Sequence, residues 1–298
     1  MNGKYKARPF KKFDIIERGK LRHIQSLYFY DRIVQRCLCD YCLVPILKRR
    51  FIADNGACLK GKGQHYASRR LKEFLRQHYQ RYGNKGYALQ FDFSKFFEQI
   101  SHALIKEIVS RNLYDADLKR LVFQLIDDFG PKKGLGLGSQ ISQILALTYA
   151  DGLDHLIKEG FRICHYIRYN DDGLLIHPSK AVLQELLDMI RVYCKRHGIV
   201  LNEKKTQIVK LSHGFVFLKA RYYLTKTGKI VKKLPKLSCG KIRRKLRKLA
   251  WMVRKGFRPI HVLTDCYMSW KGHAKHFHSW HAKRNVAGLY YDLMQAAS

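Results

Sequence analysis

Residues 163–177 read ICHYIRYNDDGLLIH. Apolar side chains on both sides of a polar turn predict two strands, 163–168 and 173–177, joined as a tight hairpin. The turn carries two adjacent acids, Asp171 and Asp172. Adjacent carboxylates repel each other unless a cation lies between them, and together they offer the oxygen ligands that hard divalent ions prefer. An isolated pair of aspartates is more often an ordinary polar turn, so its meaning depends on the rest of the chain.

A third acid stands out upstream of this hairpin. Residues 86–93 alternate in polarity and are expected to form a strand, with Asp92 near its end. A carboxylate at the end of an apolar strand is costly unless it is paired or binds a metal. Asp92, Asp171 and Asp172 are therefore expected to form one Mg²⁺ site. Two ions about 3.5–4 Å apart would hold an attacking hydroxyl and a leaving pyrophosphate in line.

The composition indicates a polyanionic partner. The 298 residues include 58 Lys and Arg against 23 Asp and Glu, a formal net charge of +35. A body this basic repels itself unless a polyanion neutralises it, and nucleic acid is the obvious candidate. A membrane surface is the weaker alternative, because no single amphipathic helix carries the charge. A generic RNA-binding protein is the plainest alternative, and a hydrophobic content of 46% excludes wholesale disorder.

No targeting or membrane-spanning segment is expected. The sequence has no run of about 18 apolar residues, and residues 1–6 lack the apolar core of a signal peptide. Eight Cys in an unsecreted chain predict reduced thiols rather than a disulfide framework. The expected location is therefore cytoplasmic, with no membrane partner.

The remaining pattern predicts an α+β fold followed by a basic helical module. Ser101 is expected to cap a helix, and a Gly-rich loop over 134–139 is expected to lead into another. Strands are expected over 1–24 with a turn at Gly19, near 206–210 and over 214–224. Helices are expected over 31–50, 65–81, 101–110, 116–129, 142–159, 181–197 and 236–255.

Six stretches resemble, in order and spacing, the motifs of reverse transcriptases. Tyr169-Asn170-Asp171-Asp172 resembles their YxDD box, and Asp92-Phe93-Ser94-Lys95-Phe96-Phe97 resembles their first catalytic motif, D-x-x-x-F-F. The other matching stretches are Asp31-Arg32-Ile33-Val34-Gln35, Gly134-Leu135-Gly136-Leu137-Gly138-Ser139-Gln140-Ile141-Ser142-Gln143, Leu201-Asn202-Glu203-Lys204-Lys205-Thr206 and Phe217-Leu218. The combination is specific, although no single motif would be.

This resemblance implies a right-hand polymerase that makes DNA on an RNA template. Its parts would be fingers over 1–85, a palm with an antiparallel sheet over 86–231 that holds a fingers insertion at about 101–141, and a helical basic thumb over 232–298. A primer 3′-hydroxyl would attack the α-phosphate of a dNTP. By resemblance, Asp92 and Asp171 bind both Mg²⁺ ions, the backbone carbonyl of Phe93 completes the shell, and Asp172 supports them. Mn²⁺ is expected to substitute for Mg²⁺.

The resemblance also implies a nucleotide site around Phe97, Leu137 and Gly138. Phe97 lies where the family has its steric gate, although Phe96 and Phe97 could both be core aromatics; neighbours on a strand would face opposite ways. Leu137 replaces the usual Gln and gives up a hydrogen bond worth about 0.5–1.5 kcal/mol, which is a physical route to copying errors. The alternative is that Leu137 arose by lineage drift and has no effect on copying fidelity. Gly138 lets backbone approach the nucleotide closely.

Three basic residues, Arg22, Lys62 and Lys205, are expected to meet the triphosphate. Arg22 lies at the end of the expected fingers strand, and Lys205 resembles the motif lysine that helps pyrophosphate to leave. The Arg of the family's F-R-P-x-x-G motif is missing, and Lys60 or Lys62 could substitute for it. Any one of these lysines could instead be solvated or bind a nucleic-acid backbone.

The motif at Leu137-Gly138-Ser139-Gln140-Ile141-Ser142-Gln143 narrows the resemblance to a subgroup. Most reverse transcriptases have Q-G-x-x-x-S-P there, and this version is similar to that of diversity-generating retroelements of bacteria and phages. This implies error-prone copying in a bacterial host cell, with a structured non-coding RNA and a small basic pentameric accessory protein as partners. Retron, group II intron-like and phage-defence enzymes share the other motifs and stay open. An RNA-binding protein on an inactive polymerase scaffold is the non-enzymatic alternative.

The basic module resembles a thumb that grips template and primer backbones. Ile242, Leu246, Leu249 and Val253 fall on one helical face. Residues expected to contact nucleic acid are Arg243, Arg244, Arg247, Lys248, Trp270 and His273. The neighbouring histidines, His276, His278 and His281, are expected to do the same rather than bind metal.

A cysteine cluster, Cys37, Cys39 and Cys42, could indicate a zinc site. Cys37 and Cys42 are five residues apart rather than one α-helical turn, and no further pair of cysteines with C-x-x-C spacing follows. Core cysteines are therefore the expectation.

Overall fold

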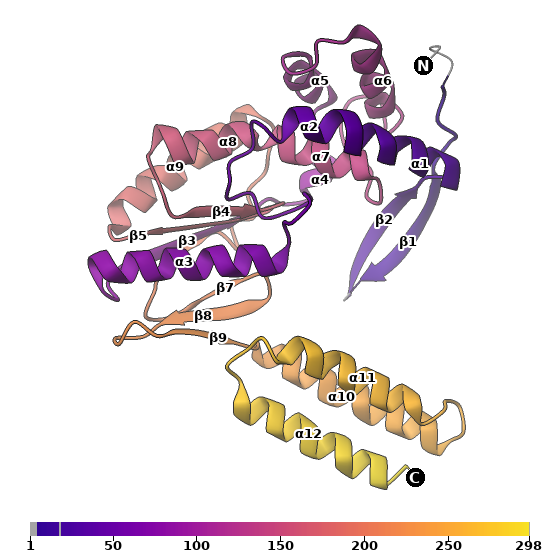
Figure 1. Ribbon diagram of the computed structural model, residues 1–298, viewed down its shortest axis with the longest axis vertical. Helices are drawn as coiled ribbons and strands as arrows, with labels where there is room; N and C mark the ends of the chain where they lie inside the picture. The colour runs from indigo at the N-terminus through magenta and orange to yellow at the C-terminus, as the bar shows by residue number, and fades with distance from the viewer. Residues whose placement is uncertain (1–4, 18, 298) are drawn as a thin grey trace. The chain divides into compact units, whose positions relative to one another are not determined.

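The computed structural model describes residues 5–17 and 19–297; residues 1–4 of the expected fingers lie outside them. Contacts divide the chain into two compact units, Met1–Phe74 with Gly86–Ile208 and Leu75–Lys85 with Val209–Ser298. This division falls inside the segment expected to be palm, so the boundaries of fingers, palm and thumb stay a prediction. The elements of both units are drawn in Figure 1.

The first unit begins with an antiparallel hairpin of β1 (Lys11–Glu17) and β2 (Lys20–Ser26). Its turn includes Gly19, whose φ of 80° is a left-handed value that glycine adopts without steric cost. The predicted hairpin is therefore confirmed. The end of β2 contacts the Gly-rich loop, because the Gln25 N–H donates to the Leu137 carbonyl at 3.1 Å.

Most helices match their predicted ranges. α5 (His102–Ser110) is capped as expected, since the Ser101 hydroxyl accepts a hydrogen bond from the Leu104 N–H. The others that agree are α3 (Gln64–Tyr82), α6 (Ala116–Asp127) and α9 (Lys180–Arg196). Within the described residues, no helix is both long and apolar enough to cross a membrane.

Two predicted helices are interrupted by π-helical turns. The helix expected over 31–50 consists of α1 (Phe29–Cys37), the π-helix η1 (Leu38–Leu43) and α2 (Val44–Leu47). The helix expected over 142–159 consists of α7 (Gln140–Tyr149), α8 (Asp151–His155) and the π-helix η2 (Leu156–Gly160). A π-turn places residues five apart on one face, and an apolar period near 3.6 does not reveal it.

A four-stranded sheet in the order β4-β5-β3-β6 positions the acids. Its strands are β4 (Tyr166–Tyr169), β5 (Asp172–His177), β3 (Tyr87–Asp92) and β6 (Gln207–Lys210). β5 pairs antiparallel with both β3 and β4, as the predicted hairpin requires. Helices α7, α8 and α9 lie along one face of this sheet (Figure 1) and share a hydrophobic core with it.

The second unit holds a three-stranded sheet and a helical bundle. The strands, in order, are β7 (Phe215–Phe217), β8 (Ala220–Leu224) and β9 (Ile230–Lys233). The single strand expected over 214–224 is wrong, because Leu218 and Lys219, with φ of 48° and 61°, turn the chain between β7 and β8. The bundle consists of α10 (Lys236–Arg254), α11 (His261–Ala274) and α12 (Trp280–Gln295).

Candidate active site

The three acids singled out in the sequence meet at one end of the β4-β5-β3-β6 sheet. Asp92, the last residue of β3, is the register partner of Asp172, the first residue of β5. Asp171 precedes Asp172 in the β4–β5 turn, and its carbonyl accepts a hydrogen bond from the Phe93 N–H at 3.1 Å. Antiparallel pairing therefore unites acids that are far apart in the sequence.

These carboxylates oppose one another's ionisation. Burial, followed by the charges of Asp171 and Asp92, raises the pKa of Asp172 to about 7. Burial is also the main cause of the raised pKa of Asp171, to which Asp92 adds, while Lys205 and Arg22 act in the opposite direction. The cluster is thus short of positive charge, as is typical of a site that binds a cation.

Asp92 is held by the segment that follows α9. Its Oδ2 accepts a hydrogen bond from Lys205 Nζ at 2.5 Å, and its Oδ1 accepts one from Asn202 Nδ2 at 3.1 Å. The Asn202 N–H also donates to the Asp92 carbonyl at 2.8 Å. Burial alone would lower the pKa of Lys205, but the hydrogen bond and charge of Asp92 raise it. Lys205 therefore lies in the site as a charged ammonium, with Asp92 as its partner.

The acids have the donor chemistry that Mg²⁺ prefers. Carboxylate oxygens are hard ligands, and a bound cation would favour the ionised forms of Asp171 and Asp172. As the side chains lie, no group of three His, Cys, Asp or Glu among the described residues is arranged to hold a metal ion. Lys205 already engages one oxygen of Asp92. The residues therefore fit a metal chemically, and the Lys205 ammonium would compete with a metal for that oxygen.

A buried ion pair supports the turn that carries Asp171. Arg168, in β4, is fully buried, and its Nε and Nη2 donate to Asp154 at 2.8 and 2.6 Å. Its Nη1 donates to the Asn170 carbonyl at 3.0 Å. Asn170 has a φ of 54°, in the left-handed region that asparagine tolerates better than most residues. The ion pair thus restrains the backbone immediately before Asp171.

A second segment braces the same turn. The Gly56 N–H donates to the Arg168 carbonyl at 2.8 Å. A Cβ at Gly56 would lie 3.0 Å from the Ala67 Cβ, so a side chain would fit only if its neighbour moved. The Cys58 thiol donates to Asn170 Oδ1 at 3.2 Å. The Arg168 backbone and the Asn170 side chain are therefore held by residues outside the hairpin.

Three residues of the expected nucleotide site are linked through β2. Leu137 forms a parallel bridge with Ile24, and Gly138 has a φ of 110°, a conformation that other residues rarely adopt. Arg22, also in β2, is close enough to the acids that its charge lowers the pKa of Asp171. The hairpin thus joins Arg22 to the Leu137–Gly138 loop and brings Arg22 near the carboxylates.

Phe97 and Lys62 lie in settings that the sequence did not indicate. Phe96 and Phe97 belong to the short helix α4 (Phe96–Gln99), so the strand assumed for them is wrong. Phe96 is buried and Phe97 only partly buried, so one of the two is a full core residue.

Lys62 Nζ donates to the Ala53 carbonyl at 2.5 Å and lies 3.9 Å from the centre of the Tyr66 ring. These contacts tie Lys62 to its own segment, and its role at a triphosphate stays a prediction.

The expected nucleic-acid residues of the second unit differ in exposure. Ile242 and Leu246 are buried, which confirms the apolar face of α10. Trp270 packs, partly buried, against the bundle core, whereas Trp280 is 60% exposed with the Arg284 guanidinium 5.3 Å from its ring centre. Trp280 is therefore better placed to stack on a base. The expected residues that are exposed are Arg243, Arg244, Arg247, Lys248 and His273.

The cysteine cluster is only partly a core feature. Cys39 is buried and Cys42 partly buried, but Cys37 is exposed, so the expectation of a core cysteine is wrong for Cys37. Cys37 ends α1, immediately before the π-helix η1, which contains Cys39 and Cys42. Cys37 and Cys42 line the same groove on the surface of the first unit.

Sequence reasoning missed four residues that shape the site: Asn202, Arg168, Asp154 and Cys58. Asn202 belongs to the L-N-x-x-K-T-like stretch, and Arg168 is a lone base in an apolar strand, so both carried a signal. Asp154 and Cys58 carried none, because they reach the β4–β5 turn only through contacts formed on folding.

Known proteins resemble this chain in sequence. A family model described as "Reverse transcriptase (RNA-dependent DNA polymerase)" matches residues 10–237. Protein YkfC of Escherichia coli K12 is 23% identical over 300 residues, which cover 85% of this chain and 78% of YkfC. The Gag-Pro-Pol polyprotein of mouse mammary tumor virus is 28% identical over 75 residues, which cover 25% of this chain and 4% of the polyprotein.

Solved structures share the fold at low sequence identity. Telomerase from Candida albicans, in a complex with a TWJ fragment of telomeric RNA, has a TM-score of 0.59 and 10% identity, covering 99% of this chain and 61% of that chain. Truncated apo telomerase from Candida tropicalis has a TM-score of 0.58 and 15% identity, covering 76% and 55%. The chain spans less than two thirds of these telomerase chains, and the likeness shows the fold alone, an α+β right-hand polymerase. Because the family model spans most of the sequence, the chain belongs to the reverse transcriptase family and to its class of enzyme, the RNA-directed DNA polymerases.

Proposed function

We propose that this protein copies an RNA template into DNA at the site formed by Asp92, Asp171 and Asp172. The meeting of these acids where β3 pairs with β5 carries the proposal. Their oxygens would hold two Mg²⁺ ions, with the Phe93 carbonyl as a further ligand and Mn²⁺ as a substitute. Bound there, the metals would polarise the reacting phosphate and favour deprotonation of the primer hydroxyl.

The chain's own residues have separate tasks in this proposal. Lys205, released from Asp92, would remain beside the acids as a cation for the departing pyrophosphate. Arg22 would face the triphosphate, since its charge already acts on Asp171. Phe97 would exclude the 2′-hydroxyl, and the Leu137–Gly138 loop would support the incoming dNTP. Lys62 completes the proposed nucleotide-binding set.

The basic side chains of α10, together with Trp270 and His273 of α11, would hold the template and primer backbones. Lysines and arginines that meet phosphates release condensed counterions, which provides sequence-independent affinity. The exposure of all of them except the partly buried Trp270 supports this role, and the same surface would bind template RNA before synthesis. The proposed residues are Arg243, Arg244, Arg247, Lys248, Trp270 and His273.

The test is dNTP incorporation on a primed RNA template with Mg²⁺, comparing wild type with Asp171→Asn. The variant keeps the shape of the side chain but removes a metal-binding charge, so the rate is expected to fall by about a thousandfold, or about 4 kcal/mol. Glu185→Gln, which removes an exposed acid from α9, is the matched control and should leave incorporation unchanged. Full activity in Asp171→Asn would contradict the proposal, and an inactive wild type that still binds RNA would favour the binding-only alternative.

We further propose that the enzyme belongs to a diversity-generating retroelement in the cytoplasm of a bacterial cell. The stretch from Leu137 to Gln143 supports this, and the proposed partners are a structured non-coding RNA and a small basic pentameric protein. The cDNA from the same assay should carry errors concentrated opposite template adenines, and Leu137→Gln should reduce them. Accurate cDNA from wild type would instead assign the enzyme to the retron or phage-defence group.

A further inference from the structure

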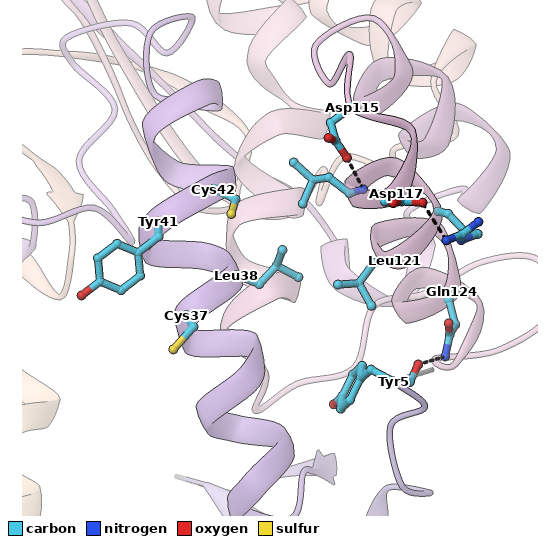
Figure 2. A pocket seen from close by; sticks show the side chains of 11 residues that line it. Tyr5, Cys37, Leu38, Tyr41, Cys42, Asp115, Asp117, Leu121 and Gln124 are labelled. Atoms are coloured by element: carbon cyan, nitrogen blue, oxygen red, sulfur yellow. Dashed lines mark hydrogen bonds and ion pairs between the residues drawn. The ribbon is translucent and has the colours of Figure 1, made fainter. Parts of the chain in front are cut away.

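A groove of about 580 Å³ lies between the π-helix η1 and helix α6 (Figure 2). Leu38, from η1, and Leu121, from α6, face each other across it. At one end, Gln124 Nε2 donates to the Tyr5 carbonyl at 3.3 Å and ties the start of the described chain to α6. The other lining residues are Cys37, Tyr41, Cys42, Asp115, Asp117, Leu118 and Arg120.

The charge of this groove is opposite to that of the chain as a whole. Its lining includes two acids, Asp115 and Asp117, and one base, Arg120, in a chain with 58 bases and 23 acids. Asp117 already neutralises Arg120 at 2.7 Å. Further acids lie beside Tyr5, since burial and then Asp31 and Asp128 raise the pKa of its hydroxyl. Phosphates would therefore be repelled here, and the groove is unsuited to the nucleic acid that the rest of the surface favours.

The local backbone offers a second indication of function. η1 is a π-helix, a form that is rare and often found at functional sites. Cys37, the last residue of α1, and Cys42, in η1, line the same groove although they are five residues apart. A regular α-helix would have separated them by well over one turn. Tyr41, also in the lining, is 81% exposed.

We propose that this groove docks a basic segment of a partner protein. Its apolar side chains would lie between leucines such as Leu38 and Leu121, and its lysines or arginines would meet Asp115 and compete with Arg120 for Asp117. An amphipathic helix fits these features, because helix-in-groove recognition uses apolar anchors at intervals of three or four residues. Charge complementarity selects a basic partner and, in a protein this basic, repels that partner from most other surfaces. The proposal is independent of the polymerase reaction.

The test uses two labelled peptides of about 14 residues, long enough to form helix on contact. One has leucine at intervals of three and four residues and lysine elsewhere, which makes a basic amphipathic helix, and the other has glutamate in place of lysine. Binding to the full chain is measured by fluorescence anisotropy. The groove variant is Asp115→Asn/Asp117→Asn, in which asparagine still caps α6. The matched control is Glu185→Gln/Asp188→Asn on α9, and Leu121→Ser against Val192→Ser tests the apolar contact.

The leucine–lysine peptide is expected to bind wild type saturably, and the double Asp variant is expected to weaken it about tenfold. Leu121→Ser should also weaken binding, whereas the α9 variants should not. All variants should incorporate dNTPs as wild type does. The leucine–glutamate peptide should bind independently of the groove residues. No binding of the basic peptide, or binding unaffected by the groove variants, would overturn the proposal. Weaker binding of single-stranded RNA in Leu121→Ser would also overturn it, and would identify the groove as a nucleic-acid surface.

Discussion

Two groups of buried acids lie close together in the first unit and differ in how far neighbouring cations neutralise them. Asp154 accepts hydrogen bonds from Tyr166 at 2.7 Å and from Arg168 at 2.8 and 2.6 Å. Asp171 and Asp172 have each other and Asp92 as neighbours, and burial followed by this repulsion raises the pKa of Asp172 to about 7. The first group is neutralised within the chain, and the second is left short of positive charge.

The contrast distinguishes a structural buried charge from a functional one. A charge that is fully paired orders its surroundings, whereas an uncompensated cluster is a place for an external cation. The two groups are joined here, because Arg168 neutralises Asp154 and also donates to the Asn170 carbonyl. The Arg168–Asp154 pair therefore restrains the turn that carries Asp171.

The largest predicted effect follows from breaking the paired group. Arg168→Met leaves Asp154 buried without its cation and is expected to lower the free energy of unfolding by about 3–5 kcal/mol. Denaturant unfolding of the full chain measures this change.

The matched variant is in the acid cluster at Asp171 and Asp172, where removing a charge is expected to have the opposite consequence for stability. Asp172→Asn removes a carboxyl whose ionisation the site already opposes, so the free energy of unfolding without added metal should not fall. The double variant Arg168→Met/Asp154→Leu should recover most of the stability that Arg168→Met loses. Equal losses in Arg168→Met and Asp172→Asn would show that the two groups do not differ.

The next prediction concerns Asp151, one turn before Asp154 on α8. Burial raises its pKa to about 6, while His155 and Arg50 oppose the rise, Asp154 adds to it and Arg168 opposes it. Below about pH 4 the group is protonated in the folded and unfolded chain. As pH rises from about 4 to 6, the unfolded chain loses this proton first, so the free energy of unfolding falls by up to about 3 kcal/mol.

Asp151→Asn should abolish this fall in the free energy of unfolding between about pH 4 and 6. The variant is expected to equal wild type near pH 4 and to be more stable above pH 6, as measured by denaturant unfolding across this range. A destabilised variant at pH 7 would show that Asp151 is paired as fully as Asp154. Arg50, at 3.6 Å, would then be its effective partner.

The smallest predicted effect tests the brace on the turn. Cys58→Ala removes the thiol that donates to Asn170 Oδ1, and kcat should fall a few-fold, about 1 kcal/mol, with little change in KM or melting temperature. Cys58→Ser keeps a donor and should restore most of the rate. A change in KM alone would instead place Cys58 in substrate binding.

Local features of this protein were predictable from local residues. Gly19 marks the hairpin turn, Ser101 caps its helix, and Ile242 and Leu246 mark the buried face of α10. Each depends on backbone preferences or periodicity within about one or two turns of chain. The π-helices escaped prediction, because their residues have ordinary helical propensities and only the packing around them selects the wider turn.

Contacts between distant segments were not predictable in the same way. The Cys58–Asn170 hydrogen bond and the Lys205–Asp92 ion pair join residues separated by 112 and 113 positions. Motif resemblance grouped Lys205 with the acids but did not show that it binds one of them. The sequence did not predict the groove beside η1, because its walls come from α6 and η1, two segments that are distant in the chain.

The sequence by itself determined the identity and order of the acids, the overall basic charge and the family of the protein. These are properties of residue types and their spacing, which exist before folding. The tertiary structure alone decided which charges are neutralised. Whether a buried carboxylate meets Arg168, Lys205 or another carboxylate depends on strand register and helix packing, and the free energy of a charge depends on its immediate neighbours.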